Sequence, residues 1–219
     1  MKNKFLKADI FLFLTIMLSN IILIYPYNNF STGNDSFQNI MLADTLIDNG
    51  FDKRIISVLS YFGMTPTSNS MGGLFVISTF CLLTDLDPEF GVLIINFLFA
   101  FLSVICTLTL ASAITRDRFF MLSLVVLYCL SKNVTDLTQW TYSFRGLFRV
   151  LEPLAFFIIF KLSKELDYRG FVLGFLFFIT LSSVHQQSFF FLFVFASVIV
   201  VKFVYPAFKE YSFSQTSLM

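Results

Sequence analysis

Three groups of polar residues in this chain could do chemistry together, although long apolar stretches separate them. The first is a single carboxylate, the second is an arginine pair beside a glutamate, and the third surrounds the only histidine. The candidate residues are Asp35, Arg145, Arg149, Glu152, His185 and Gln186. Guanidinium and imidazole groups can bind phosphates and sugar hydroxyls. These residues therefore suggest a ligand that is anionic, sugar-like or lipid-like.

Asp35 begins an amphipathic segment that ends at Gly50. Asp35 and Gln38 form a capping-box pattern, and Gly50 suits the position just past a helix end. We therefore predict a helix over residues 36–49 that lies at a membrane surface. Its apolar face consists of Phe37, Ile40, Met41 and Ile47. The first interpretation of Asp35 is a helix cap, which is compatible with a chemical role because a capping carboxylate keeps free lone pairs.

Arg145, Arg149 and Glu152 lie near the start of an apolar stretch over residues 144–162. Residues three and four apart are neighbours on a helix, so these side chains share one face. An outward-facing arginine pair suits a lipid phosphate or pyrophosphate, which a guanidinium group binds through two hydrogen bonds. The alternative stays equally open: Arg149 pairs with Glu152, and Arg145 extends toward the lipid headgroups.

His185 and Gln186 lie in a polar segment between two apolar runs. The simpler interpretation is a loop residue that forms hydrogen bonds, and the functional one is a donor to a phosphate or a sugar hydroxyl. One histidine cannot make a metal site. The acidic cluster within residues 85–89 is better explained as a solvated helix end than as a cation site. We expect no cofactor, and these residues do not support a divalent metal.

The composition requires a bilayer as the solvent. Of the 219 residues, 57% are hydrophobic and 13% are charged, which is about half the charged fraction of soluble proteins. One water-soluble domain cannot hide so much apolar surface. The net charge is +1 and no basic cluster follows a phosphate backbone, so nucleic acid is not an expected partner. The three cysteines lie singly in apolar runs and indicate neither disulfides nor a metal site.

The charges of the loops decide the topology. The run over residues 71–84 is short for a span, which needs about 20 residues. If this run stays outside as an interfacial or re-entrant helix, the short loops rich in Lys and Arg all fall on the cytoplasmic side, as the positive-inside rule requires. The expected spans are then residues 10–25, 90–114, 119–130, 144–162, 170–181 and 189–205.

We therefore predict an all-α fold, a polytopic transmembrane helix bundle of about six spans in a single transmembrane domain over residues 1–219. Both termini are expected in the cytoplasm, as in an integral, multi-pass membrane protein. The outer loop, residues 26–89, holds the two short helices over 36–49 and 71–84, which lie on the membrane. The candidate residues all fall on the outer side.

Residues 34–50 follow the first predicted span and contain an acidic residue, an amphipathic helix and then a glycine. The matching segments within them are Asn-Asp-Ser-Phe at 34–37 and Ala-Asp-Thr-Leu-Ile-Asp-Asn-Gly at 43–50. Further matching segments are Thr-Pro-Thr at 65–67, Gly-Gly-Leu at 72–74, Leu-Thr-Asp-Leu-Asp-Pro at 83–88 and Ser-Val-His-Gln at 183–186. This pattern resembles the N-terminal part of the GT-C superfamily. Its members are integral-membrane glycosyltransferases that use polyprenyl-phosphate-linked sugars.

The resemblance implies an active site in the first outer loop, with Asp35 at the position of the family's acidic residue. Asp35 is then the candidate base, and Arg145 and Arg149 hold the leaving phosphate. No general acid is needed, because a phosphate leaves as a stable anion. The family often has a second acidic residue where this chain has Ser36, and the next outer loop offers only Asp136, so the match does not extend to a metal-dependent reaction.

Members of this superfamily are generally much longer, so we expect this chain to lack the C-terminal half of a full-length enzyme. The expected partners are a lipid-linked sugar donor, membrane lipids and a second chain that supplies the missing helices. The alternative is a non-catalytic polytopic membrane protein, either a truncated remnant or a subunit that binds a lipid carrier or assists assembly. The sequence leaves open whether the chain is an enzyme.

Overall fold

The computed structural model describes residues 13–22, 25, 31, 34–50, 72–136, 142–165 and 167–204. These residues contain helices and no strand, which confirms the all-α prediction. The elements are a helix over Phe13–Ile22, α2 (Asn34–Asn49), α4 (Gly72–Thr84), α5 (Pro88–Ile114), α6 (Arg118–Cys129), α7 (Lys132–Thr135), α8 (Phe144–Lys164), α9 (Tyr168–Val184), α10 (Ser188–Ile199) and the π-helical η1 (Val200–Val204).

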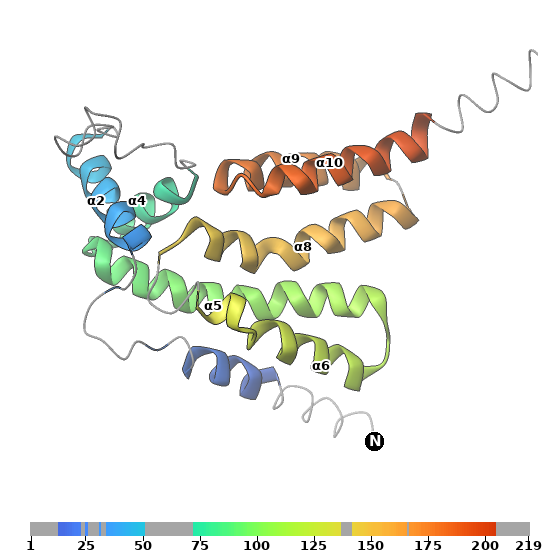
Figure 1. Cartoon of the computed structure of the whole chain (residues 1–219), viewed down its shortest axis with the longest axis horizontal. Coiled ribbons are helices and arrows are strands. Elements are labelled where there is room, and N and C mark those ends of the chain that lie inside the picture. The colour runs from blue at the N-terminus through green and yellow to red at the C-terminus, as the bar shows by residue number, and fades with distance from the viewer. Residues whose placement is uncertain are drawn as a thin grey trace, which may run out of the picture.

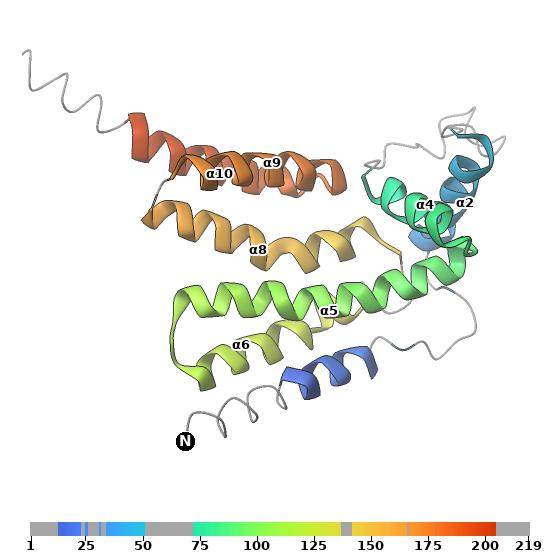
Figure 2. The same ribbon diagram turned by 180° about the vertical axis from the view of Figure 1, so that it is seen from behind.

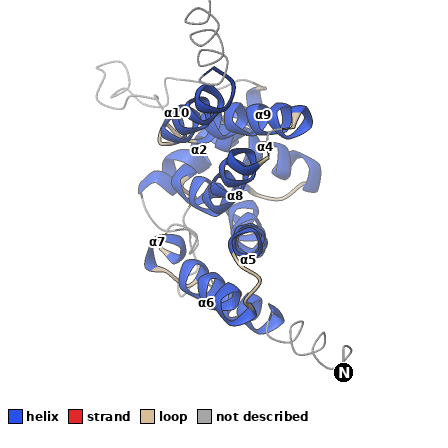
Figure 3. Cartoon of the chain, turned by 90° about the vertical axis from the view of Figure 1, so that its right-hand side faces the viewer, coloured by secondary structure: helices blue, strands red, loops and turns tan. Residues whose placement is uncertain are grey.

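The Phe13–Ile22 helix, α5, α6, α8, α9 and α10 lie roughly along one axis, and α2 and α4 lie at one end of it (Figure 1). We call this the α2–α4 end. The connections at 85–87, 142–143 and 185–187 meet there, whereas those at 115–117 and 165–167 lie at the opposite end (Figure 2). Viewed along the axis, α8 lies between α5 on one side and α9 and α10 on the other (Figure 3).

Apolar side chains of α8 fill the centre of the bundle. They pack against α5 on one side, and aromatic residues of α9 and α10 complete the core on the other. The ring centroids of Phe178 and Phe195 lie 4.9 Å apart, and those of Phe148 and Phe191 lie 5.8 Å apart. Gly174 allows α9 to approach closely, because a Cβ atom there would lie 3.1 Å from a side-chain atom of Phe195.

Among the described residues, α5 alone is long and apolar enough to cross a bilayer by itself, at 27 residues. The Phe13–Ile22 helix, α4, α6, α9 and α10 are apolar but shorter. One such helix is weak support for a membrane location, because the core helix of a soluble protein can have the same composition.

Large apolar side chains cover much of the outward surface of the helices. They lie on α5, α6, α9 and α10, and soluble monomers rarely expose so many large apolar side chains together. Residues that are at least half exposed include Leu98, Leu127, Leu173, Leu176, Phe189 and Phe193. This surface agrees with the composition in favouring an apolar surrounding.

Helix α2 begins two residues before its predicted start. It spans Asn34–Asn49, so Asp35 lies in the first turn and not at the N-cap position. The cap interpretation of Asp35 was therefore wrong. The C-terminal prediction is confirmed: Gly50 has a φ of +71°, and its N–H donates to the carbonyl of Leu46 at 2.9 Å. Glycine adopts this left-handed conformation at no steric cost.

The predicted apolar face of α2 is divided between the surface and the bundle. Phe37 and Met41 are 54% and 53% exposed, whereas Ile40 and Ile47 are partly buried and pack against the core. Helix α2 also turns Ser36 and Asn39 toward the bundle, where both bond to the backbone of Tyr142. Periodicity alone could not predict this rotation, because it depends on hydrogen-bond partners far along the chain.

Candidate functional site

Hydrogen bonds through Tyr142 join the starts of α2 and α8 to α4. The backbone N–H of Tyr142 donates to Ser36 Oγ at 2.8 Å, and Asn39 Nδ2 donates to the Tyr142 carbonyl at 2.9 Å. The Tyr142 hydroxyl donates to the carbonyl of Gly73 in α4. Tyr142 is 1% exposed. These bonds fix the first turn of α2 beside the N-terminal start of α8. Asp35 lies in that turn, and its side chain is exposed.

Helix α8 starts with a side-chain cap and then presents its two arginines differently. Ser143 Oγ accepts a hydrogen bond from the N–H of Arg145 at 3.2 Å. The side chain of Arg145 is exposed, and it forms no ion pair with any described residue. Arg149 Nη1 lies 2.8 Å from Glu152 Oε2, with the two side chains 33% and 17% exposed. The Arg149–Glu152 pair named as the structural alternative is thus present.

A proline within α8 explains why a tyrosine from α6 joins this ion pair. Pro153 has no N–H to donate to the carbonyl of Arg149, four residues earlier. The Tyr128 hydroxyl supplies the missing donor and lies 2.5 Å from that carbonyl. The same hydroxyl lies 3.3 Å from Glu152 Oε2. Tyr128, Arg149 and Glu152 therefore form one connected polar cluster between α6 and α8.

His185 ends α9 and lies close to the same arginines. Its Nδ1 accepts a hydrogen bond from the N–H of Gln187 at 3.1 Å, and its ring centroid is 5.7 Å from that of Phe148. Burial lowers the pKa of His185 below 6.5, and the charges of Arg145 and Arg149 lower it further. At neutral pH the ring is thus uncharged. Because Nδ1 accepts, the proton lies on Nε2, which can donate to a ligand.

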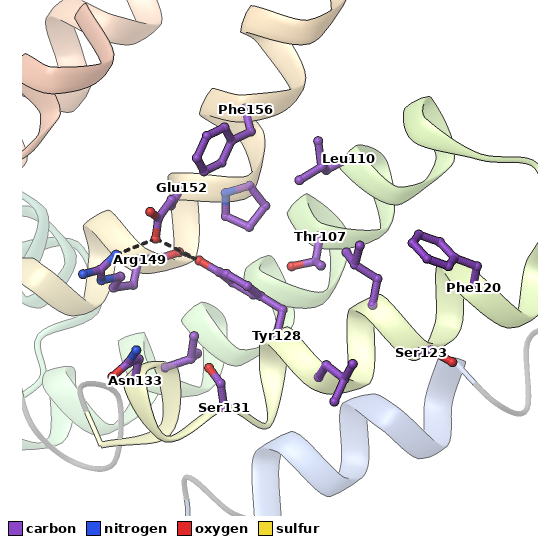
Figure 4. A pocket seen from close by; sticks show the side chains of 14 residues that line it. Thr107, Leu110, Phe120, Ser123, Tyr128, Ser131, Asn133, Arg149, Glu152 and Phe156 are labelled. Carbon is purple, nitrogen blue, oxygen red and sulfur yellow. Dashed lines mark hydrogen bonds and ion pairs between the residues drawn. The ribbon is translucent and has the colours of Figure 1, made fainter. Parts of the chain in front are cut away.

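A cavity of about 560 Å³ lies among α5, α6, α7 and α8 (Figure 4). Tyr128, Arg149 and Glu152 form a polar part of its wall, and most of the remaining wall is apolar. Asp35, Arg145, His185 and Gln186 do not line it. The candidate residues therefore share one end of the molecule but not one cavity, and Gln186 is exposed in the turn between α9 and α10.

Two of the three acidic residues at the start of α5, Asp87 and Glu89, have structural roles. The carboxylate of Asp87 accepts a hydrogen bond from the N–H of Glu89 at 2.8 Å and caps α5. The carboxylate of Glu89 accepts one from the N–H of Ser31 at 2.9 Å. Within the described part of the chain, no three His, Cys, Asp or Glu side chains are grouped so that they could hold a metal ion.

Three important residues, Ser36, Tyr128 and Tyr142, were missing from the candidates. Tyr128 and Pro153 carried a usable signal, because tyrosines near the end of an apolar run often find a polar partner, and an internal proline frees a carbonyl four residues earlier. Ser36 and Tyr142 carried none, because 106 residues separate the two partners.

The comparisons with known proteins give no further guide to this site. No family model matches the chain, and no curated protein or solved structure matches it. The chemistry of the site therefore rests on the residues themselves.

Proposed function

We propose that this chain is a multi-pass membrane protein with about six crossing helices, the α2–α4 end at the outer face and both termini in the cytoplasm. The alternating direction of the helices along one axis supports this arrangement (Figure 1). So do the basic residues within or beside the connections at the opposite end, among them Arg116, Lys164 and Arg169, which satisfy the positive-inside rule there. Tilt and local thinning of the bilayer accommodate the short helices.

In this arrangement the chain acts as a GT-C-like glycosyltransferase, or as its N-terminal module. A sugar moves from a polyprenyl-phosphate donor to an acceptor at the outer face. The bond between the sugar's anomeric carbon and the acceptor forms, and the bond to the phosphate oxygen breaks. Asp35 takes the acceptor's proton, and the polyprenyl phosphate leaves as an anion. Arg145 and Arg149 stabilise that charge, and His185 donates a hydrogen bond from Nε2.

The single observation that carries this proposal is the convergence of the candidate residues at the α2–α4 end. Tyr142 holds the first turn of α2, with the exposed Asp35, beside the start of α8. Arg145 follows Tyr142 by one turn, and the charges of both arginines act on His185. Arg145 is the stronger phosphate ligand of the two, because Glu152 already neutralises Arg149.

A specific observation favours the alternative, a non-catalytic membrane protein that binds a lipid carrier. The described cavity takes in Arg149 and Glu152 but leaves Asp35 and His185 outside. A protein that only bound a lipid phosphate would need the arginines and would not need a base. The two functions therefore differ in whether they require Asp35: sugar transfer needs it as a base, and lipid binding does not.

Binding of farnesyl phosphate to the protein in nanodiscs tests the phosphate site, with native mass spectrometry as the readout. Arg145→Gln is expected to weaken binding about tenfold or more, since a hydrogen bond to a charged group contributes roughly 1.5–3 kcal/mol. Arg169→Gln is the matched control, because Arg169 is exposed at the opposite end. Equal loss in both variants, or no binding by the unmodified protein, contradicts the proposal.

Sugar transfer from radiolabelled polyprenyl-phosphate sugars in native membranes tests the base. Asp35→Asn should lower transfer by roughly 10²–10⁴-fold and leave farnesyl phosphate binding unchanged. Asp48→Asn, near the other end of α2, is the control. A fully active Asp35→Asn variant removes the enzymatic proposal. Binding without transfer in the unmodified protein favours the non-catalytic alternative.

A further inference from the structure

The cavity among α5, α6, α7 and α8 has the shape of a site for one lipid chain with its headgroup. Its polar part, at Tyr128, Arg149 and Glu152, lies on the side of the α2–α4 end (Figure 4). The apolar wall runs down α6 from Tyr128 to Phe120, about 12 Å at 1.5 Å per residue. Half of the roughly 30 Å hydrocarbon core is about 15 Å, so the wall is about one leaflet deep.

The volume and lining also agree with a bound amphiphile. At about 560 Å³ the cavity falls within the range of roughly 300–1,000 Å³ that small-molecule sites occupy. Its apolar wall includes Leu110, Leu124, Leu127, Pro153 and Phe156. A chain in this cavity would bury apolar surface, and the polar cluster would contact its headgroup.

The charges at the polar part balance. Of the described residues that line the cavity, only Arg149 and Glu152 carry a charge, and they form an ion pair. Glu152 Oε2 accepts the hydrogen bonds from Arg149 and Tyr128. Glu152 Oε1 accepts none from the described residues. A purely anionic headgroup would meet a net charge near zero. A headgroup with both charges can place each one against its opposite.

We infer that this cavity binds one outer-leaflet phospholipid whose headgroup is zwitterionic and carries a primary ammonium, as phosphoethanolamine does. The phosphodiester accepts hydrogen bonds from the Arg149 guanidinium, and the ammonium donates to the free oxygen of Glu152. One acyl chain lies along Leu110, Leu124 and Phe156. The inference rests on the proposed membrane placement and does not depend on Asp35. Because the bound phospholipid occupies Arg149, the donor's phosphate in the proposed reaction is then held by Arg145 and His185.

Lipid competition in nanodiscs tests this inference. The bulk lipid is phosphatidylcholine, with equal minor fractions of phosphatidylethanolamine and phosphatidylglycerol, and native mass spectrometry reports which lipid stays bound. The unmodified protein should retain phosphatidylethanolamine in excess over phosphatidylglycerol by about tenfold. Glu152→Gln leaves Arg149 unneutralised and should reverse the preference toward phosphatidylglycerol. Arg149→Gln should abolish retention of both.

Two leucine variants separate the cavity from the general lipid surface. Leu124→Trp fills the cavity and should remove retention of either lipid, whereas Leu173→Trp, on the exposed face of α9, should change nothing. Retention of phosphatidylglycerol by the unmodified protein overturns the zwitterionic assignment. Absence of any retained lipid, or of the reversal in Glu152→Gln, overturns the site. Failure of the protein to enter nanodiscs would instead remove the membrane placement on which both proposals rest.

Discussion

The two ends of the bundle are held together by different kinds of hydrogen bond. At the α2–α4 end, the bonds from Tyr142 to Ser36 and Gly73 are buried and join residues 106 and 69 positions apart. At the opposite end, the carboxylates of Asp117 and Asp167 cap their own helices, with partners two and three residues away. These bonds at the α2–α4 end thus fix the relative positions of separate helices, whereas the two caps at the opposite end each act within one helix.

The largest expected effect concerns the sides of the membrane on which the two ends lie. The three native cysteines are buried, so single cysteines introduced at exposed positions report accessibility without interference. In the proposed arrangement, Gln186→Cys, in the exposed turn at the α2–α4 end, should react in cells with a membrane-impermeant maleimide added outside. Arg116→Cys, at the opposite end, should react only after permeabilisation. Reaction of both from the same side would place both ends on one face and remove the six-span arrangement.

The next effect concerns the buried bonds themselves. Tyr142→Phe removes the donor to the Gly73 carbonyl and should lower the free energy of unfolding by about 1–3 kcal/mol, because the carbonyl stays buried without that partner. Tyr168→Phe is the matched control at the opposite end, where the side chain is 82% exposed, and should change it by less than about 0.5 kcal/mol. Unfolding in mixed micelles measures both. Equal effects would erase the difference between the ends.

A double-mutant cycle tests how Tyr128 and Pro153 depend on each other. Tyr128→Phe alone should destabilise the protein by about 1–2 kcal/mol, because the Arg149 carbonyl loses its donor. In a Pro153→Ala background the helix supplies its own N–H to that carbonyl, so Tyr128→Phe should cost less. A coupling energy of at least about 0.5 kcal/mol is expected. Strict additivity would mean that the hydroxyl does not replace the missing helical bond.

The smallest expected effect is a pH dependence confined to the α2–α4 end. The pKa of His185 is lowered in the folded protein, so the unfolded chain takes up this proton first as the pH falls. Stability should therefore decrease as the pH falls through and below 6.5. His185→Asn keeps an acceptor for the N–H of Gln187 and should flatten this part of the profile. Thermal unfolding between pH 7 and pH 5 compares the two proteins, and parallel profiles would rule out the contribution of His185.

The sequence was sufficient to predict where the helices lie along the chain, but it predicted few of the contacts between them. Apolar runs and polar interruptions predicted the positions of α5, α6, α8, α9 and α10 to within a few residues, because each helix depends on local pattern. The rotation of α2 was not predictable, since Ser36 and Asn39 face inward only where Tyr142 offers its backbone groups. Of the candidate site, the Arg149–Glu152 pair followed from helical spacing, whereas the contribution of Tyr128 required knowing that α6 packs beside α8.

The proline of α8 also has a consequence for the order in which the protein is made. In the proposed membrane arrangement, the Arg149 carbonyl without a donor would cost several kcal/mol in hydrocarbon. Its donor is Tyr128, which lies in α6, earlier in the chain. During synthesis from the N-terminus, the helix that supplies the hydroxyl therefore exists before the helix that needs it. In that arrangement, α8 would insert beside a helix that has already been made.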